Sequence, residues 1–205
     1  METFHGQNPT RIRIIQLIVG IGVLFRSKFK CTNFDNLKHT MNPSDVFRKR
    51  NLSKVNFEYE DLIGRDLSDT NMKGVDLKNR DIHNADLSCT DLSGADLSGT
   101  ILFYVKFRGS DMRGTNISNA KLWDTELYGA YLQEADLRGA DLFYADLRNA
   151  DLREANLAGV NLRHANFEGA ILTSTNFTNA NYDLDTLDTI SANTKTMLKK
   201  QGNLW

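Results

Sequence analysis

Residues 135–159 read ADLRG ADLFY ADLRN ADLRE ANLAG, which is five successive units of five residues with one shared pattern. Each unit begins with alanine, continues with aspartate or asparagine, and has leucine at its centre. A period of five fits neither the roughly 3.6 residues of a helical turn nor the two-residue period of a strand. The chain must therefore change direction once in every unit.

The pattern extends in both directions, over 27 consecutive units that occupy residues 50–184. The central residue is apolar or aromatic in all 27 units, and the residue before it is Asp or Asn in 21 of them. The first residue is Ala, Thr, Val or Ser in all 20 units from position 85 to position 180. Since only 40% of the chain is apolar, chance does not produce such a run. The central residue and the small first residue are predicted to face inward.

The other positions indicate how the chain turns, and we call the second position of a unit its turn position and the last two its corner positions. Asp and Asn bond nearby backbone through their side chains, and Gly tolerates a positive φ, so all three are typical of turns. Gly recurs at the second corner position, as at Gly94, Gly99 and Gly139. We expect each unit to form one side of a four-sided coil.

This pattern resembles the pentapeptide-repeat family, whose motif is A-(D/N)-L-x-x. The resemblance covers residues 50–184 and implies an all-β solenoid, a right-handed, four-sided (quadrilateral) parallel β-helix with four units in each coil. At the ~4.8 Å spacing of stacked chains, the 27 units would form a rod roughly 30 Å long. The uninterrupted tract resembles cyanobacterial members. Members that act on DNA topoisomerases often carry projecting loops, and none is visible in this tract.

The ends of a solenoid expose apolar side chains, so short helical caps are expected at both. Asn42 and Pro43 have the character of a helix start, which predicts an N-terminal cap over residues 42–49. A C-terminal cap over residues 185–205 is predicted from apolar residues with helical spacing, namely Leu187, Ile190, Met197 and Leu198.

Residues 1–41 form a leader with a different composition. Lys and Arg exceed Asp and Glu by 5 over residues 1–49, whereas the balance is −7 over residues 50–184. The apolar segment Ile14–Phe25 has 12 residues, fewer than the ~20 that a membrane-spanning helix needs. A segment of this length could still tether the protein to a membrane surface, so a membrane-associated protein stays an open alternative. Met41 stands just before the helix start, which raises the hypothesis that the functional protein begins there.

No pattern in the sequence indicates catalysis or a bound cofactor. The four histidines are scattered, no Cys/His spacing of a zinc site occurs, and no nucleotide-binding or nucleophile motif is complete. Asp recurs along the rod because it serves the turns, and catalytic carboxylates would also need a pocket. We therefore expect a protein without catalytic, cofactor or metal site. Cys31 and Cys89 are best interpreted as free thiols in the cytoplasm.

The candidate binding site follows from residues that depart from the repeat. Residues 20 apart are expected to lie in one column, and the column through Phe103, Trp123 and Phe143 is aromatic at three successive levels. Exposed aromatic residues beside arginines are typical of binding sites. The predicted protein-binding residues are Phe103, Tyr104, Arg108, Trp123, Tyr128, Phe143, Tyr144, Arg148 and Arg163. Two other interpretations stay open: the rings only stack along the rod, or residues 1–40 fold over them.

Three functions are compatible with these features. The first is a non-enzymatic protein–protein interaction scaffold or regulator that uses the aromatic face. The second is a DNA mimic that binds a type II topoisomerase through an acidic rod, although outward arginines dilute the acidic faces. The third is the membrane-associated protein. Direct nucleic-acid binding is not expected, because phosphate would repel the acidic repeat tract.

Overall fold

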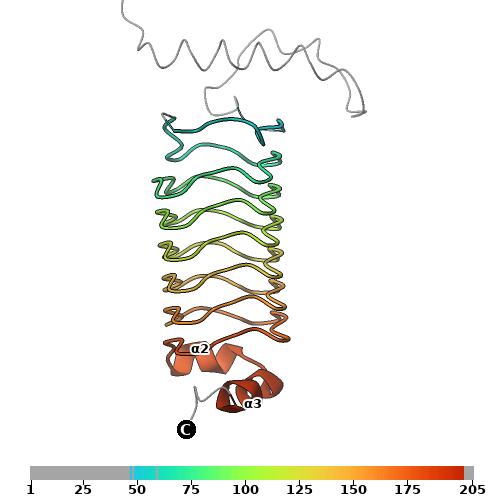
Figure 1. Ribbon diagram of the computed structural model, residues 1–205. Coiled ribbons are helices and arrows are strands. Elements are labelled where there is room, and N and C mark those ends of the chain that lie inside the picture. Colours follow the sequence, from blue (N-terminus) through green and yellow to red (C-terminus); the bar gives the residue numbers. More distant parts are fainter. Residues whose placement is uncertain (1–46, 48, 59, 201–205) are drawn as a thin grey trace, which may run out of the picture. The chain divides into compact units, whose positions relative to one another are not determined.

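The computed structural model describes residues 47, 49–58 and 60–200, which belong to one compact unit, Asn42–Trp205 (Figure 1). The predicted leader, Cys31 and the start of the N-terminal cap lie outside these residues. Phe47, from the predicted cap, is buried.

Four units make one coil, and successive coils stack on one another (Figure 1). Parallel bridges join turn positions that are 20 residues apart, for example Asp81 with Ile101 and Ile101 with Lys121. These are single-residue bridges, because the chain turns again before a longer strand can form. The repeat therefore builds a β-helix whose sides are isolated bridges in the described residues.

Every backbone N–H of a regular unit has a partner, as unit 140–144 illustrates. Ala140 donates to the preceding unit, Asp141 to the coil before, and Leu142 and Tyr144 to the coil after, at 2.8–3.2 Å. The N–H of Phe143 instead donates to the Asp141 carboxylate at 3.3 Å. The turn position thus accepts the one N–H that no backbone carbonyl reaches, which explains its preference for Asp and Asn.

The second corner residues have a left-handed backbone conformation. All 24 second corner positions from Gly64 to Asn179 have a positive φ, between 54° and 73°. Ten of them are Gly, for which this conformation carries no steric penalty. The sequence signal from Gly94, Gly99 and Gly139 is therefore confirmed.

The interior is filled by the residues predicted to face inward. The central residues Leu62 through Leu157 are fully buried or nearly so, and large rings such as Phe57, Phe107 and Phe177 also lie inside. Inward hydroxyls are satisfied by backbone carbonyls, as when Thr90 donates to Leu67 at 2.9 Å. The predicted inward register is confirmed.

Three charged residues occupy inward positions in the first coils: Glu60, Arg65 and Arg80. They are half-buried, and the Arg80 guanidinium donates to the carbonyl oxygens of Glu58 and Glu60. Burial raises the pKa of Glu60, against the opposing effect of Arg65 and Arg80. In the first coils, the Arg80 side chain thus fills space that the neighbours of a small residue fill in the later coils.

Two helices follow the last coil, α2 (Leu184–Thr189) and α3 (Ala192–Lys200). Side chains at α2 accept N–H groups that a further coil would have accepted: the Asp183 carboxylate bonds the N–H of His164, and the Thr189 hydroxyl bonds that of Phe167. Ile190 and Leu198 are buried. In the described part of the chain, neither helix is long and apolar enough to span a bilayer.

Candidate functional site

Where the turn position is Asp or Asn, its bond to the corner is nearly universal, which makes the other turn positions informative. In 20 units of the described residues, this Asp or Asn accepts the N–H of the first corner residue. Other residue types occupy the turn position at Ile101, Lys106, Lys121, Glu126, Tyr131 and Ile171.

Four of these exceptions form one contiguous patch. Ile101 is bridged to Lys121, and Lys106 to Glu126, on neighbouring sides of two successive coils. Isoleucine and lysine carry no acceptor, so they cannot bond the N–H of the first corner residue. Glu126 instead pairs with Arg108 at 2.5 Å. A local stabilising bond is therefore missing where the outward aromatic residues begin.

The outward aromatic rings contact one another in series. Ring centroids lie 5.3 Å apart for Phe103 and Trp123, and 6.0 Å apart for Trp123 and Phe143. Tyr144 meets Phe143 edge-on at 4.5 Å and stacks on His164 at 4.6 Å. We call these five residues the aromatic surface. The predicted column is confirmed, and tilting of the rings sets the centroid spacing.

Much of this surface is accessible to solvent among the described residues. Trp123 is 47% exposed and Tyr144 54%, whereas Phe103 and Phe143 are half-buried. Tyr104, next to Phe103 in the chain, is 57% exposed. The rings therefore combine mutual packing with a large exposed apolar area.

Two tyrosines of this region also occupy strained positions. Tyr104 and Tyr144 have φ values of 59° and 60° at second corner positions. Bulky side chains rarely adopt this conformation, which Gly, Asn, Asp and His enter at lower cost. The fold alone would favour small residues here, so these rings are not explained by turn formation.

The predicted arginines separate into two groups. Arg148 lies over the ring of Tyr128 at 5.8 Å, and Arg108 pairs with Glu126 beside it. These three predicted residues thus lie together on the next side of the coils. Arg163 lies 4.0 Å from the Asp183 carboxylate, at the C-terminal end of the aromatic column.

Arginines at first corner positions, Arg148 among them, pair with the aspartates at the turn positions of their own units. Arg138 donates to both Asp136 oxygens, at 2.8 and 2.6 Å, while that carboxylate still accepts the backbone N–H. Hydrogen bonds from arginine lower the pKa of four such carboxyls, more than burial raises it: Asp111, Asp136, Asp146 and Asp151. These pairs place a positive charge beside four of the carboxylates on the faces of the rod.

Comparison with protein families agrees with this geometry. The family model described as pentapeptide repeats matches in 8 copies, over residues 51–88, 81–119, 110–149, 120–159 and 150–181. Together these ranges cover more than half of the chain. The chain belongs to the pentapeptide-repeat family. Membership carries the right-handed quadrilateral β-helix that the resemblance implied.

Solved structures of other pentapeptide-repeat proteins are similar to this chain. A protein from the Arabidopsis thaliana thylakoid lumen is 35% identical, with 60% of this chain and 77% of that chain covered and a TM-score of 0.28. HetL from the cyanobacterium Nostoc, involved in heterocyst differentiation regulation, is 27% identical over 57% and 63%, with a TM-score of 0.26. QnrB1, a plasmid-mediated fluoroquinolone resistance protein, is 16% identical over 77% and 90%, with a TM-score of 0.40. No curated protein matches the chain.

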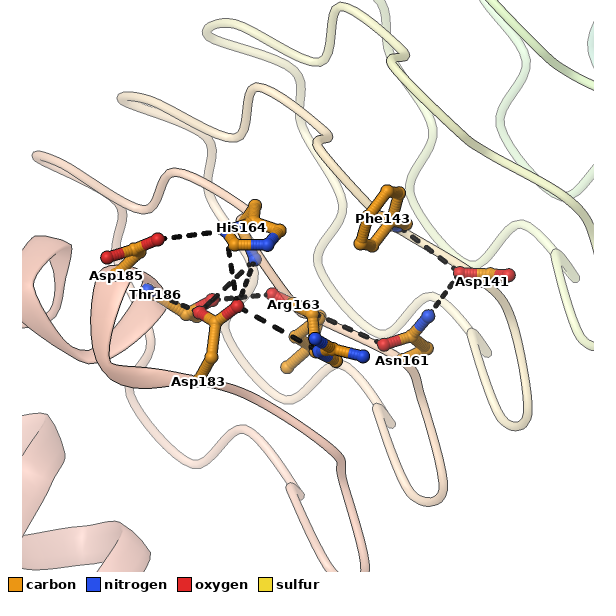
Figure 2. A network of polar contacts seen from close by, with 9 residues as sticks. Asp141, Phe143, Asn161, Arg163, His164, Asp183, Asp185 and Thr186 are labelled. Carbon is orange, nitrogen blue, oxygen red and sulfur yellow. Dashed lines mark hydrogen bonds and ion pairs between the residues drawn. The ribbon is translucent and has the colours of Figure 1, made fainter.

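The junction between the repeat tract and α2 brings polar groups to the end of the aromatic surface (Figure 2). Asp183 is the N-cap of α2 and accepts hydrogen bonds from the N–H and hydroxyl of Thr186, at 3.0 and 2.9 Å. Burial alone would raise the pKa of Asp183, but these bonds and the His164 N–H lower it. The His164 ring reaches Asp185 at 2.9 Å.

Sequence reasoning missed His164 as a member of the aromatic surface. Its signal was present, because His164 lies 20 residues after Tyr144 and therefore in the same column. Tyr131 is a further exposed ring, at 51%, but it lies at a turn position on another side of the coils. Tyr104 has no ring contact among those found in the described residues, so it lies beside the series instead of within it.

Proposed function

We propose that this pentapeptide-repeat protein is a non-enzymatic interaction module that binds a protein partner through the aromatic surface. The observation that carries the proposal is a run of departures from the repeat along one side of three successive coils. Turn positions Ile101 and Lys121 lack the acceptor that the backbone uses. Tyr104 and Tyr144 stand at corner positions with positive φ, and both rings are exposed, as is Trp123. Departures from local folding rules concentrate at functional sites.

The surface also has the composition of a binding site. Trp, Tyr and Arg are the residues in which binding energy concentrates, and Trp123, Tyr144 and Arg163 lie along one edge of the rod. Stacking of the rings explains their mutual contacts but not their exposure, since a structural ladder would need no half-exposed Trp. Partner binding accounts for both.

Two other functions have weaker support. A topoisomerase-binding DNA mimic needs a strongly acidic face, and the Arg–Asp pairs such as Arg138–Asp136 reduce that charge. A gyrase supercoiling assay would detect it. Membrane association depends on Ile14–Phe25, which lies outside the described residues, and cell fractionation would test it. We propose a cytoplasmic protein, in keeping with the free, exposed thiol of Cys89.

The test is capture of partners by the full chain and two matched variants. Trp123→Ala removes the centre of the aromatic surface, whereas Tyr131→Ala removes an equally exposed ring on another side. We expect Trp123→Ala to melt like wild type, because this side chain fills no interior space, and to lose the proteins that Tyr131→Ala still captures. Equal capture by wild type and Trp123→Ala, with normal melting, would remove the aromatic surface as the binding site.

A further inference from the structure

Three possible metal ligands converge where the last coil meets α2. The Nδ1 atom of His164 lies 3.2 Å from Asp183 Oδ2 and 2.9 Å from Asp185 Oδ2, and the three donor atoms lie within 4.8 Å of one another. Figure 2 shows these side chains turned toward one point between coil and helix. The ligands come from two segments about one coil apart in sequence, so no local motif announces them.

Two of the three side chains are held in place by other contacts. The His164 ring stacks on Tyr144 and meets Phe143 edge-on at 5.4 Å, which limits its rotation. Asp183 accepts three hydrogen bonds, from the His164 N–H and from two groups of Thr186. Asp185 is exposed, and within the described part of the chain His164 is the one residue that it contacts. Ordered ligands lower the cost of gathering a metal site.

Two carboxylates approach one ring nitrogen, which can carry only a single hydrogen. A guanidinium, that of Arg163, lies 4.0 Å from the Asp183 carboxylate. With zinc–nitrogen and zinc–oxygen bonds of about 2.0–2.2 Å, tetrahedral donors lie roughly 3.3 Å apart, close to the two separations from the His164 nitrogen.

We propose that His164, Asp183 and Asp185 bind a divalent transition-metal ion, with Zn²⁺ as the representative ion. One imidazole and two carboxylates suit Zn²⁺, whereas Ca²⁺ prefers six to eight oxygen ligands. Three protein ligands leave the fourth position to water or to a partner's side chain. The bound ion links the last coil to α2, next to the aromatic surface. Metal binding at this site is independent of the proposed protein-binding function.

The experiment is calorimetric titration of the full-length chain with Zn²⁺, and with Ca²⁺ in parallel. Because residues 1–46 also contain His5, Cys31 and His39, the site is identified by the difference between variants. Asp185→Asn removes a ligand that takes no part in capping α2, and Asp188→Asn is its control on the same helix. We expect Asp185→Asn to weaken one Zn²⁺ site about tenfold or more, and Asp188→Asn to leave it within about twofold.

A second pair of variants separates the loss of a metal ligand from indirect effects on folding. His164→Gln should abolish the same site, whereas His83→Gln should not, since His83 contacts the single carboxylate of Asp81. Melting without metal checks that Asp185→Asn remains folded. The proposal is overturned if Asp185→Asn and His164→Gln bind Zn²⁺ as wild type does, or if Ca²⁺ binds this site as tightly as Zn²⁺.

Discussion

Two regions of the rod have the same interior and different surfaces. In the regular region, residues 135–159, all five turn positions are Asp or Asn, whereas five of seven are not in the substituted region, residues 101–131. Yet Leu122 and Leu142, one from each region, are both fully buried, and bridges join the coils alike in both. Interior packing and bonds between coils therefore carry the fold, and the surface can vary independently.

The largest effect should come from the shared interior. Leu142→Ala and Leu122→Ala should each lower the free energy of unfolding by about 2–5 kcal/mol, because each leaves a cavity between packed coils. Urea unfolding followed by circular dichroism measures both. A much smaller loss for Leu122→Ala would mean that the two regions differ inside as well as outside.

A smaller effect should follow from exchanging the turn positions of the two regions. Asp136→Ala removes the acceptor for the Arg138 N–H and should lower the free energy of unfolding by about 0.5–2 kcal/mol. Lys121→Asn supplies an acceptor for the Trp123 N–H and should raise it by about 0.5–1.5 kcal/mol.

Thermal melting of both variants tests this exchange, with Lys121→Gln as the control, since its longer side chain is not suited to the short-range bond. If Lys121→Asn and Lys121→Gln melt alike, the missing acceptor is not what distinguishes the substituted region.

The smallest change in the free energy of unfolding, counted for each residue pair, should appear when the pH is lowered. The pKa values of Asp136, Asp146 and Asp151 are lowered in the folded chain, chiefly by hydrogen bonds from arginines. Their contribution to stability is therefore present above the unfolded value of about 4 and is lost as the pH falls through the folded pKa. Hydrogen exchange at pH 3 should show protection falling more in the regular region, which holds these three pairs, than in the substituted region, where Asp111–Arg113 is the one such pair among the described residues. An equal decline in both regions would contradict this.

Much of the fold could be predicted because a strict period leaves little freedom. Once every fifth residue was apolar, the inward register of Leu137, Leu142 and Leu147 followed, and all three are fully buried. The turn role of Asp and Asn followed equally from their chemistry. The positive φ at Tyr104 and Tyr144 could not be predicted in the same way. Residue propensities favour Gly and Asn at these positions and do not indicate where another residue type adopts this conformation.

The C-terminal end was predicted less completely. Apolar spacing indicated a short helix from Leu187 to Leu198, with an interruption left open, and the described residues form two helices, α2 and α3, with Ile190 between them. The meeting of His164 with Asp183 and Asp185 depends on where α2 begins, half a unit after the last bridge at Asn181. The position of that start depends on the capping of α2 by Asp183. Here the chain begins a helix instead of another turn, and the repeat pattern does not indicate where this change occurs.

The 20-residue coil also constrains how such a chain can change length during evolution. Duplicating one unit of five residues would preserve the interior, yet it would rotate everything after it by a quarter turn. An insertion between Trp123 and Phe143 would separate those rings, and one between Tyr144 and His164 would separate that pair. Duplicating a whole coil would leave every column in register. A surface site that spans several coils can therefore accept an insertion within it only in steps of four units, while the core tolerates steps of one.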